Sequence, residues 1–590
     1  MTHAIPEQFL EPLRRALGWL LTLRDPEGRI VCPEHRIEHT GKSAGAAVLA
    51  ARLAKHDRPE FRAAHVAAAI QQGRRLVANL YREGESACHT FWPGRHDKFN
   101  SSNAVIDGGA CSDALAELVQ ELGPELSADD ARAFRDASLL HARTYLRYAV
   151  LDKGIPAQRA WGLSGLAAAW SLEHDSELEQ AALQALGALE GVQHSDGSFP
   201  YHPLEWGAEH PGASDVSSFY HSRIPGFSLF ALERLGRDIV RTPFAPSLRA
   251  ALDFAEALHG PDGLKCGLVE AKPWYWGAEY EVASHVFDVY ALLRGWKLFG
   301  EPRFARAALR AFRTWSEHLL PTGQPRSHFD APGRTKSYQC PVFWACHAEW
   351  IARVLPELVE ASARIELNPR GPGAGIDLSI RWFPDAQLAR LEDDRVVAWV
   401  RGVRPPYNVH HGSPHGAGLL RVVRKVDGAN LLARQRLAAV QEGEWSGHAG
   451  SSSFARGWAH GAKEMRFSLW LARNHARGRR LGLAARAPFE ALSHGVLDFA
   501  SREVSSAFDR APRVSVDGEG VTVESALTLR GGELAGGARL RRRFEIDGKG
   551  LVASEQVLDA DSVRQLRFQW PAQATERSGD GLAGAEYRLA

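Results

Sequence analysis

No uninterrupted apolar run in this 590-residue sequence approaches the ~18 residues that a membrane-spanning helix needs, so we expect no membrane partner. Charge of one sign is not in excess either: 71 lysines and arginines face 70 aspartates and glutamates, so net charge predicts no nucleic-acid partner. Composition, with 45% hydrophobic and 24% charged residues, excludes wholesale disorder. The chain is too long for one core, and we expect two or three domains.

Closely spaced cysteines are also missing, and we expect no secretory leader. The sequence has six cysteines without a CxxC pair, which favours reduced, individually packed thiols over disulfides or zinc. The apolar stretch from Ala16 to Leu23 is flanked by charges and has helical spacing, which predicts an amphipathic helix rather than a signal peptide. Both features favour a cytoplasmic protein, although a trimmed sequence of a periplasmic or secreted protein would look the same.

A repeat occupies residues 1–355. Apolar helices rich in small residues are predicted to begin near Ser43, Cys111, Ala160, Pro225, His285 and Phe343. A more charged amphipathic helix precedes each, beginning near Phe9, Phe61, Ala128, Ser176, Ala245 and Pro302. Six helical hairpins predict an (α/α)6 toroid, complete or incomplete. Glycine and alanine permit close approach, so we expect the small-residue helices to form the inner ring.

The loops that lead from outer to inner helices are mostly long and rich in histidine and aromatic residues. They cover approximately residues 26–42, 82–110, 153–159, 195–224, 261–284 and 321–342. Alternating hairpins place all six loops at one end of the ring. Long loops with their own chemistry on a rigid scaffold usually build a binding site.

A linker at 356–375, rich in proline and glycine, precedes a different pattern. Residues 376–590 alternate in short strand-like runs, with turn pairs such as Asp517-Gly518 and Asp547-Gly548, and predict an antiparallel β-sandwich. Its loop histidines His410, His411 and His415 are weak metal-ligand candidates, because no carboxylate or cysteine stands at ligand spacing. We expect a loop with polar contacts and no cofactor.

One of the long loops resembles a known family. Asp196-Gly197-Ser198-Phe199, then His202, then Tyr220 ahead of a glycine-containing apolar helix, is similar to the catalytic segment of toroid polysaccharide lyases of the hyaluronate and chondroitin AC type. Those enzymes also join a toroid to a C-terminal β-sandwich, and alginate lyases and heparinase II/III-like proteins share much of that plan. Here 17 residues separate His202 from Tyr220, more than in the family pattern, and His221 follows directly.

The resemblance implies cleavage of an acidic, uronic-acid-containing polysaccharide by β-elimination. The proton next to the uronate carboxylate is a weak acid, so donors must neutralise the carboxylate, and Asn103 is the candidate. Tyr220 would act as base and acid, with His202 or His221 as a second proton-transfer group. The reference pKa of tyrosine, ~10, is too high for a base at neutral pH, and the cation Arg223 would lower it. The structural alternative for these residues is a helix cap or a turn.

Residues in the other loops are candidates for substrate binding. They are the histidine His39, the cations Lys42, Arg326 and Lys336, and the aromatic residues Trp206, Trp274, Trp276 and Tyr280. Aromatic faces stack on sugar rings and cations attract an anionic polymer, but packing of the ring edge and solvated loop charges explain the same residues.

Other functions remain open. A glycoside hydrolase on the same toroid would use paired carboxylates, and the candidates are Asp107, Glu205, Glu209, Asp215, Glu279 and Glu281. A uronate C5-epimerase would begin with the same proton abstraction. A carbohydrate-binding protein without catalysis would keep only the fold.

Overall fold

A computed structural model describes residues 5–33, 38, 40–89, 99, 102–201, 216–268, 282–326, 341–367, 378–402, 417–432, 442–449, 458, 462, 503–509, 511–529 and 534–590. The chain divides into two compact units. One consists of Met1–Glu256 with Glu279–Leu367, and the other of Ala257–Ala278 with Asn368–Ala590. Among the described helices, none is long and apolar enough to cross a membrane.

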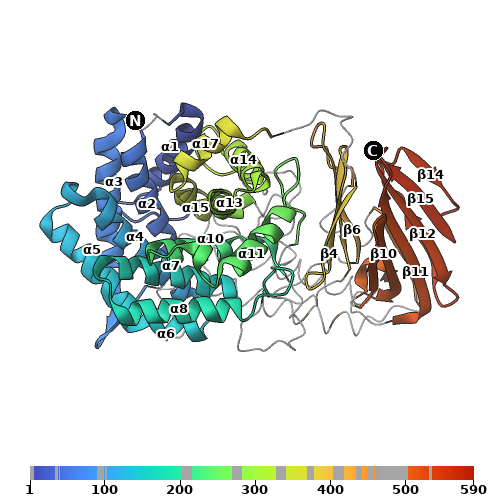
Figure 1. The fold of residues 1–590 in the computed structure, drawn as a ribbon, viewed down its shortest axis with the longest axis horizontal. Coiled ribbons are helices and arrows are strands. Elements are labelled where there is room, and N and C mark those ends of the chain that lie inside the picture. Colours follow the sequence, from blue (N-terminus) through green and yellow to red (C-terminus); the bar gives the residue numbers. More distant parts are fainter. Residues whose placement is uncertain are drawn as a thin grey trace. The chain divides into compact units, whose positions relative to one another are not determined.

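The first unit is a closed ring of helical hairpins (Figure 1). Contacts between successive inner helices run from α2 through α4, α7, α10 and α13 to the short helices α15 and α16, which return to α2. The predicted (α/α)6 toroid is therefore confirmed, and of the two forms left open the ring is complete. The inner helices are α2 (Thr40–His56), α4 (Ser102–Leu122), α7 (Pro156–Glu173), α10 (Arg223–Arg234), α13 (His285–Phe299), α15 (Pro341–Cys346) and α16 (Glu349–Ala352). The outer helices are α1 (Glu7–Thr22), α3 (Pro59–Ala78), α5 (Ala128–His141), α8 (Ser176–Glu190), α11 (Ala245–Ala257) and α14 (Pro302–Glu317).

Some boundaries differ from the sequence expectation. Helix α4 begins at Ser102, well before Cys111, because its first turns contain small residues that carry no clear periodicity. Helix α17 (Leu355–Arg364) extends into the segment expected to be a linker, and it buries Leu355, Leu358 and Ala361. Helix α5 continues through a π-helical turn, Ala142–Leu146, into α6 (Arg147–Asp152), and the hairpin β1 (Tyr81–Glu83) and β2 (Ser86–Cys88) precedes α4.

Glycine lets the inner helices approach closely. A Cβ atom on Gly165 of α7 would lie 2.3 Å from the backbone oxygen of Gly109 on α4, and one on Gly109 would lie 2.2 Å from the oxygen of Trp161. Gly45 of α2 is in the same position against the oxygen of Cys346, at 2.6 Å. Small residues are therefore required in the inner ring by backbone contact, as the sequence predicted.

A tight turn recurs where four outer helices lead into their loops. Its glycine has a positive φ each time: 78° at Gly28, 84° at Gly197, 82° at Gly263 and 83° at Gly323. A Cβ on Gly197 would lie 2.2 Å from the oxygen of Ala250, and one on Gly323 would lie 2.0 Å from the oxygen of Arg15. Both the left-handed conformation and the close packing on a neighbouring helix demand glycine.

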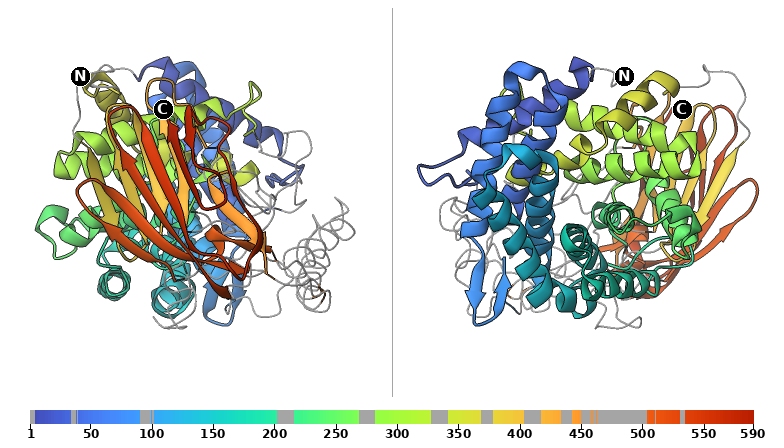
Figure 2. Two further views of the ribbon diagram at one scale, coloured as in Figure 1. Left: turned by 90° about the vertical axis from the view of Figure 1, so that its right-hand side faces the viewer. Right: turned by 60° about the vertical axis from the view of Figure 1, so that its left-hand side comes forward.

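The described residues of the second unit form two antiparallel sheets, and the larger one is curled (Figure 2). The smaller has the order β3 (Ser379–Phe383), β4 (Leu388–Glu392), β5 (Val396–Arg401), β6 (Gly418–Arg424). Within the described residues the larger has the order β13-β7-β8-β10-β11-β12-β15-β14, and β9 also pairs with β10. Its strands are β7 (Glu444–His448), β8 (Glu503–Ser505), β9 (Arg513–Val516), β10 (Gly520–Leu529), β11 (Leu534–Ile546), β12 (Leu551–Asp559), β13 (Arg564–Gln569), β14 (Glu576–Ser578) and β15 (Gly584–Leu589).

The two sheets share one apolar core, as a β-sandwich requires. Val400 and Leu419 of the smaller sheet belong to the same buried cluster as Trp445, Val523 and Phe544 of the larger. The predicted turn pairs lie between strands: Asp517 accepts hydrogen bonds from the backbone of Glu519 and Gly520, and Gly548 has φ 74°. The expected antiparallel β fold is therefore confirmed.

Replacing Gly165 with alanine tests the close packing of the inner ring. The added methyl group meets backbone rather than a flexible side chain, so we expect a loss of about 1–3 kcal/mol in the free energy of unfolding. Gly187→Ala is the matched control, because Gly187 lies inside α8 with nothing within 4 Å of its Cβ position. It should gain about 0.5–1 kcal/mol from helix propensity. Thermal and denaturant unfolding measure both, and equal effects would refute the close-packing argument.

Candidate functional site

Arg223 is the first residue of inner helix α10, and it lies among aromatic rings. Only 3% of it is exposed. Its guanidinium carbon lies 4.6 Å from the ring centroid of Phe219 and 4.7 Å from that of Tyr220, both in the short helix α9 (Ser218–His221). The structure thus brings together Tyr220 and Arg223, which the sequence proposed as partners.

Three further rings complete the surroundings of this guanidinium. Its carbon is 5.5 Å from the centroid of Trp161 on α7, 5.1 Å from Phe287 on α13 and 5.2 Å from Phe343 on α15. We call Trp161, Phe219, Tyr220, Phe287 and Phe343 the aromatic cage. Because the cage is built from several inner helices, it lies inside the ring, near the N-terminal ends of these helices.

Lys42 adds a second cation to the cage. This residue stands in the first turn of α2, and its ammonium nitrogen is 5.8 Å from the centroid of Phe343. Tyr201 extends the aromatic surface, with its ring centroid 4.8 Å from that of Tyr220. Cations on aromatic faces suit an anionic ligand that also offers a ring to stack on.

His347 is a residue that the sequence analysis did not single out. It is 1% exposed, and its ring centroid lies 4.9 Å from Trp161, 5.5 Å from Phe287 and 4.5 Å from Phe343. Its Nδ1 is 3.4 Å from Oε1 of Glu349. One signal was present in the sequence: His347 lies inside a predicted inner helix, where a polar residue among alanines and tryptophans needs a partner.

His221 faces a different direction. Its Nε2 is 2.9 Å from the backbone oxygen of Ala251 on the outer helix α11, and its ring packs edge-on against Phe254 at 4.8 Å. It is 1% exposed. The structure therefore separates His221 from the cage, although it is the chain neighbour of Tyr220.

The Asp-Gly-Ser-Phe segment, which supports the family resemblance, is one of the recurring turns. Oδ1 of Asp196 accepts hydrogen bonds from the backbone nitrogen of Ser198 at 3.0 Å and from its hydroxyl at 2.7 Å. Ser198 is fully buried, and Phe199 packs near His221. This segment has a structural role that three other hairpins repeat.

The remaining proposed site residues stay predictions. Asn103 lies in the first turn of α4, at the N-terminal end where the cage is found, but its side chain is outside the described part of the structure. Arg326 is exposed after α14, and its backbone nitrogen donates to His318. His39, His202, Trp206, Trp274, Trp276, Tyr280, Lys336, His410, His411 and His415 lie outside the described residues. Among the residues that are described, no group of three metal-ligating side chains occurs.

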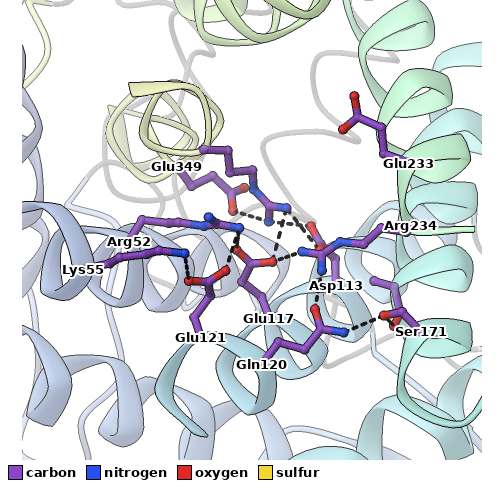
Figure 3. Close-up of polar contacts among 12 residues, drawn as sticks. Arg52, Lys55, Asp113, Glu117, Gln120, Glu121, Ser171, Glu233, Arg234 and Glu349 are labelled. Atoms are coloured by element: carbon purple, nitrogen blue, oxygen red, sulfur yellow. Dashed lines mark hydrogen bonds and ion pairs between the residues drawn. The ribbon is translucent and has the colours of Figure 1, made fainter. Parts of the chain in front are cut away.

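The other half of the ring interior contains a network of buried ion pairs (Figure 3). Glu117 of α4 is at its centre, with no exposed side-chain surface, and it pairs with Arg52 of α2, Arg234 of α10 and Arg353, which follows α16. Arg353 also lies 2.7 Å from Asp113 and 3.4 Å from Glu349. Arg52 and Lys55 extend the network to Glu121, and Gln120 donates to Ser171.

These pairs cross the interior of the ring. Helix α7 lies between α4 and α10 in the ring order, and α2 lies between α4 and α16. Side chains from α4 that reach both α10 and Arg353 therefore join helices that are not neighbours. Arg52 and Arg234 are near the C-terminal ends of their helices, so the network occupies the end of the ring opposite to the loops.

Burial and charge act against each other on the carboxyl groups of the network. Burial raises the pKa of Asp113 to about 7 and that of Glu349 to about 7, although Arg353 opposes the shift in both. Burial also acts to raise the pKa of Glu117, but the attraction of Arg52, Arg353 and Arg234 outweighs it and holds that pKa well below its usual range. The arginines around Glu117 thus favour its ionised form.

Comparisons with known proteins found distant similarity in structure. No family model matches the sequence, and no curated protein matches it. Three solved structures are examples of this similarity. Cellobiose 2-epimerase from Bacillus thermoamylovorans is 13% identical, with a TM-score of 0.44 over 59% of this chain and 100% of that one. A polysaccharide lyase is 11% identical, with a TM-score of 0.43 over 61% and 99%. A glycosyl hydrolase family 88 protein from Bacteroides vulgatus is 11% identical, with a TM-score of 0.43 over 60% and 99%.

The identities are too low to choose among an epimerase, a lyase and a hydrolase. Similarity at TM-scores below 0.5 indicates neither the reaction nor the substrate of this chain.

Glu117→Gln tests the network. Removing this charge leaves buried arginines without their shared partner, so we expect a loss of about 3–5 kcal/mol in the free energy of unfolding. Glu360→Gln is the control. Glu360 is one-third exposed and lies 2.9 Å from Lys297 on the surface, so its replacement should cost less than about 1 kcal/mol. Similar losses for both variants would contradict a special role for Glu117.

Asp113→Asn tests the raised pKa. A carboxyl group whose folded pKa lies above its unfolded value favours the protonated folded state, so wild-type stability falls as pH rises from about 4 to about 7. Asparagine imitates the protonated form and does not titrate. The stability of the variant relative to wild type should therefore increase between pH 5 and pH 8, as measured by urea unfolding. A constant difference would rule out the shift.

Proposed function

We propose that this protein is an enzyme that cleaves a uronic-acid-containing polysaccharide by β-elimination, with Tyr220 as its proton-transfer residue. The observation that carries the proposal is the position of the Arg223 guanidinium, 4.7 Å from the centroid of the Tyr220 ring and inside the aromatic cage. A cation this close favours the phenolate form of a tyrosine, which is the form that removes a proton.

The surroundings strengthen this effect. Arg223 is almost completely buried, and the rings around it exclude water, so its charge acts through a medium of lower dielectric constant than bulk solvent. Tyr220 is partly exposed, unlike Arg223, so it is the more accessible of the two residues. This pairing of a buried cation with a more accessible phenol supports a base at the loop end of the ring.

The substrate class follows from charge. Arg223 and Lys42 place two cations on one aromatic cluster. A uronate unit offers both a carboxylate for such cations and a sugar ring for the aromatic faces. Lys42, together with the amide proposed at Asn103, would neutralise the carboxylate while the adjacent carbon loses its proton.

The chemistry proceeds in one balanced sequence. Tyr220 takes the proton from C5, the electron pair forms the C4–C5 double bond, and the bond from C4 to the glycosidic oxygen breaks. The same phenol then returns the proton to the leaving oxygen. An epimerase would share the first step and return the proton to the other face of C5.

Hydrolysis has less support. It needs two carboxylates at the site, whereas Asp113, Glu117 and Glu349, which lie in the ring interior, are all engaged by arginines. Of the carboxylates proposed for hydrolysis, Asp107 is the one within the described residues, and it is 5% exposed.

Tyr220→Phe tests the proposal on a panel of acidic polysaccharides. Wild type should generate ultraviolet absorbance from the new conjugated double bond, and the variant should lose at least about 100-fold in kcat, the scale of general acid–base catalysis. Tyr148→Phe is the matched control, because Tyr148 is 56% exposed and has the Arg147 guanidinium 4.7 Å from its ring. It should behave as wild type.

The same assay separates the alternatives. Release of sugar without ultraviolet absorbance would show that the protein is a hydrolase and not a lyase. Equal absorbance from wild type and Tyr220→Phe would support lyase activity and refute a catalytic role for Tyr220.

A further inference from the structure

Two buried histidines lie where the β1–β2 hairpin meets the outer helices α3 and α5. His89 directly follows β2, His141 is the last residue of α5, and neither side chain is exposed. Their ring centroids are 5.3 Å apart, with an angle of 67° between the ring planes. At this separation a charge on one ring acts directly on the other.

Each imidazole donates one hydrogen bond to the backbone of another element. Nε2 of His89 donates to the oxygen of Leu76 in the last turn of α3, at 3.0 Å. Nδ1 of His141 donates to the oxygen of Ala87 in β2, also at 3.0 Å. A carbonyl oxygen can only accept, so these two nitrogens carry protons and the tautomer of each ring is fixed.

The second nitrogen of each ring has no acceptor for a further proton. Nδ1 of His89 and Nε2 of His141 are buried and have no hydrogen-bond partner in the described part of the chain. A Cβ on Gly108 of α4 would lie 1.9 Å from Nε2 of His141, so the backbone of α4 packs directly against this nitrogen. A proton added to either ring would become a buried donor without an acceptor.

The surrounding groups supply no counter-charge. Across the residues that the structure describes, no hydrogen bond joins a carboxylate to either imidazole. Asp107, the neighbour of Gly108, is directed at α2, where a Cβ on Gly41 would lie 2.4 Å from its Oδ1. The other charged or titratable groups on these elements are the ion pairs Arg75–Glu38, Arg143–Glu173 and Arg143–Asp175, the hydrogen-bonded Tyr81 and Glu83, and Tyr145, Lys153, Cys88 and Cys111. An imidazolium here would be a buried cation without an opposite charge.

The same hydrogen bonds attach the hairpin to the ring. The backbone nitrogen of Ala87 donates to Oγ1 of Thr144 at 3.0 Å, and its oxygen accepts from His141. Thr144 belongs to the π-helical turn that directly follows His141. Because His89 bonds to α3, the two histidines and Thr144 connect β2 and the residue after it to both outer helices.

We propose that His89 and His141 form an acid-sensitive switch, in which proton uptake by the pair releases the β1–β2 hairpin from α3 and α5. The hairpin stands in the connection from α3 to α4, so the switch makes the structure of one outer-to-inner connection depend on pH. The inference is independent of the proposed function.

The pH range of the switch follows from burial. Burial lowers the pKa of His89 to about 4, and the hydrogen bond to Leu76 opposes this effect only in part. Burial, together with the charge of His89, lowers the pKa of His141 well below its usual range. An exposed histidine has a pKa of about 6.5, so the released state binds more protons than the attached state. Attachment is therefore complete above about pH 6.5 and is lost as the pH falls toward about 4.

Hydrogen exchange of the full chain, followed by mass spectrometry at pH 6 and pH 5, measures the release. After correction for intrinsic exchange rates, the opening constant of residues 81–89 should rise about 50-fold between these pH values, because two histidines take up protons. Peptides from α14 should change less than about threefold. A local readout is needed because Asp113 and Glu349 have raised pKa values and stabilise the folded chain at low pH.

His89→Gln and His141→Asn are the test variants. Each places an amide nitrogen where the donating ring nitrogen lies, so the hydrogen bond to the backbone is kept and the titration is removed. The rise should fall to about 7-fold in either single variant and disappear in the double variant. His174→Asn is the control, because His174 is exposed at the left-handed cap of α7, and it should keep the rise of about 50-fold.

Three results would overturn the inference. Equal opening of wild type at pH 6 and pH 5 would do so even if the variants failed to fold. An undiminished rise in the double variant would show that other groups take up the protons. A wild-type rise of only about 7-fold that one single variant abolishes would show that one histidine titrates and that the pair does not act together.

Discussion

The arrangement of the ring depends on the charge of Glu117. Three arginines from different parts of the ring reach this one carboxylate, which has no exposed side-chain surface. Buried charges are tolerated only with complete pairing, so the network specifies which inner helices face one another as well as stabilising them. The centre of a toroid must be filled by side chains, and here paired charged side chains fill the end opposite to the loops.

The two ends of the interior therefore differ in electrostatic character. At the C-terminal ends of the inner helices, carboxylates and arginines form ion pairs, so their charges offset one another. At the N-terminal ends, Arg223 and Lys42 lie on aromatic faces. Aromatic rings stabilise a cation without neutralising it, so the positive potential remains available to an anionic ligand. This contrast gives the ring a chemically distinct end, on the side where its long loops begin.

The sequence predicted the hairpins because helical periodicity is local, and it predicted Tyr220 beside Arg223 because three residues in a chain place them within reach. Contacts between segments far apart in the chain could not be predicted in the same way. Asp196-Gly197-Ser198-Phe199 resembled a catalytic segment, yet Gly28, Gly263 and Gly323 stand in equivalent turns, and Asp262-Gly263 repeats the Asp196-Gly197 pair. His221 was taken with Tyr220 because the two are adjacent, but successive residues of a helix point to different sides. The interruption of the sixth inner helix between Cys346 and Glu349 could not be predicted either, and it packs against Gly45, some 300 residues earlier in the chain.

Glu349 connects the two halves of the interior. One of its oxygens contacts His347 beneath the aromatic cage, and the other contacts Arg353 in the network. Burial raises its pKa to about 7, so its charge is decided near neutral pH by the balance between Arg353 and the neighbouring carboxylates. A proton gained by Asp113 leaves Arg353 freer to pair with Glu349, and an ionised Glu349 holds the imidazole more firmly. The network at one end of the ring is thus part of the electrostatics of the other end. A change in the number of charges in the network should alter the electrostatic potential at the aromatic cage without any movement of the helices.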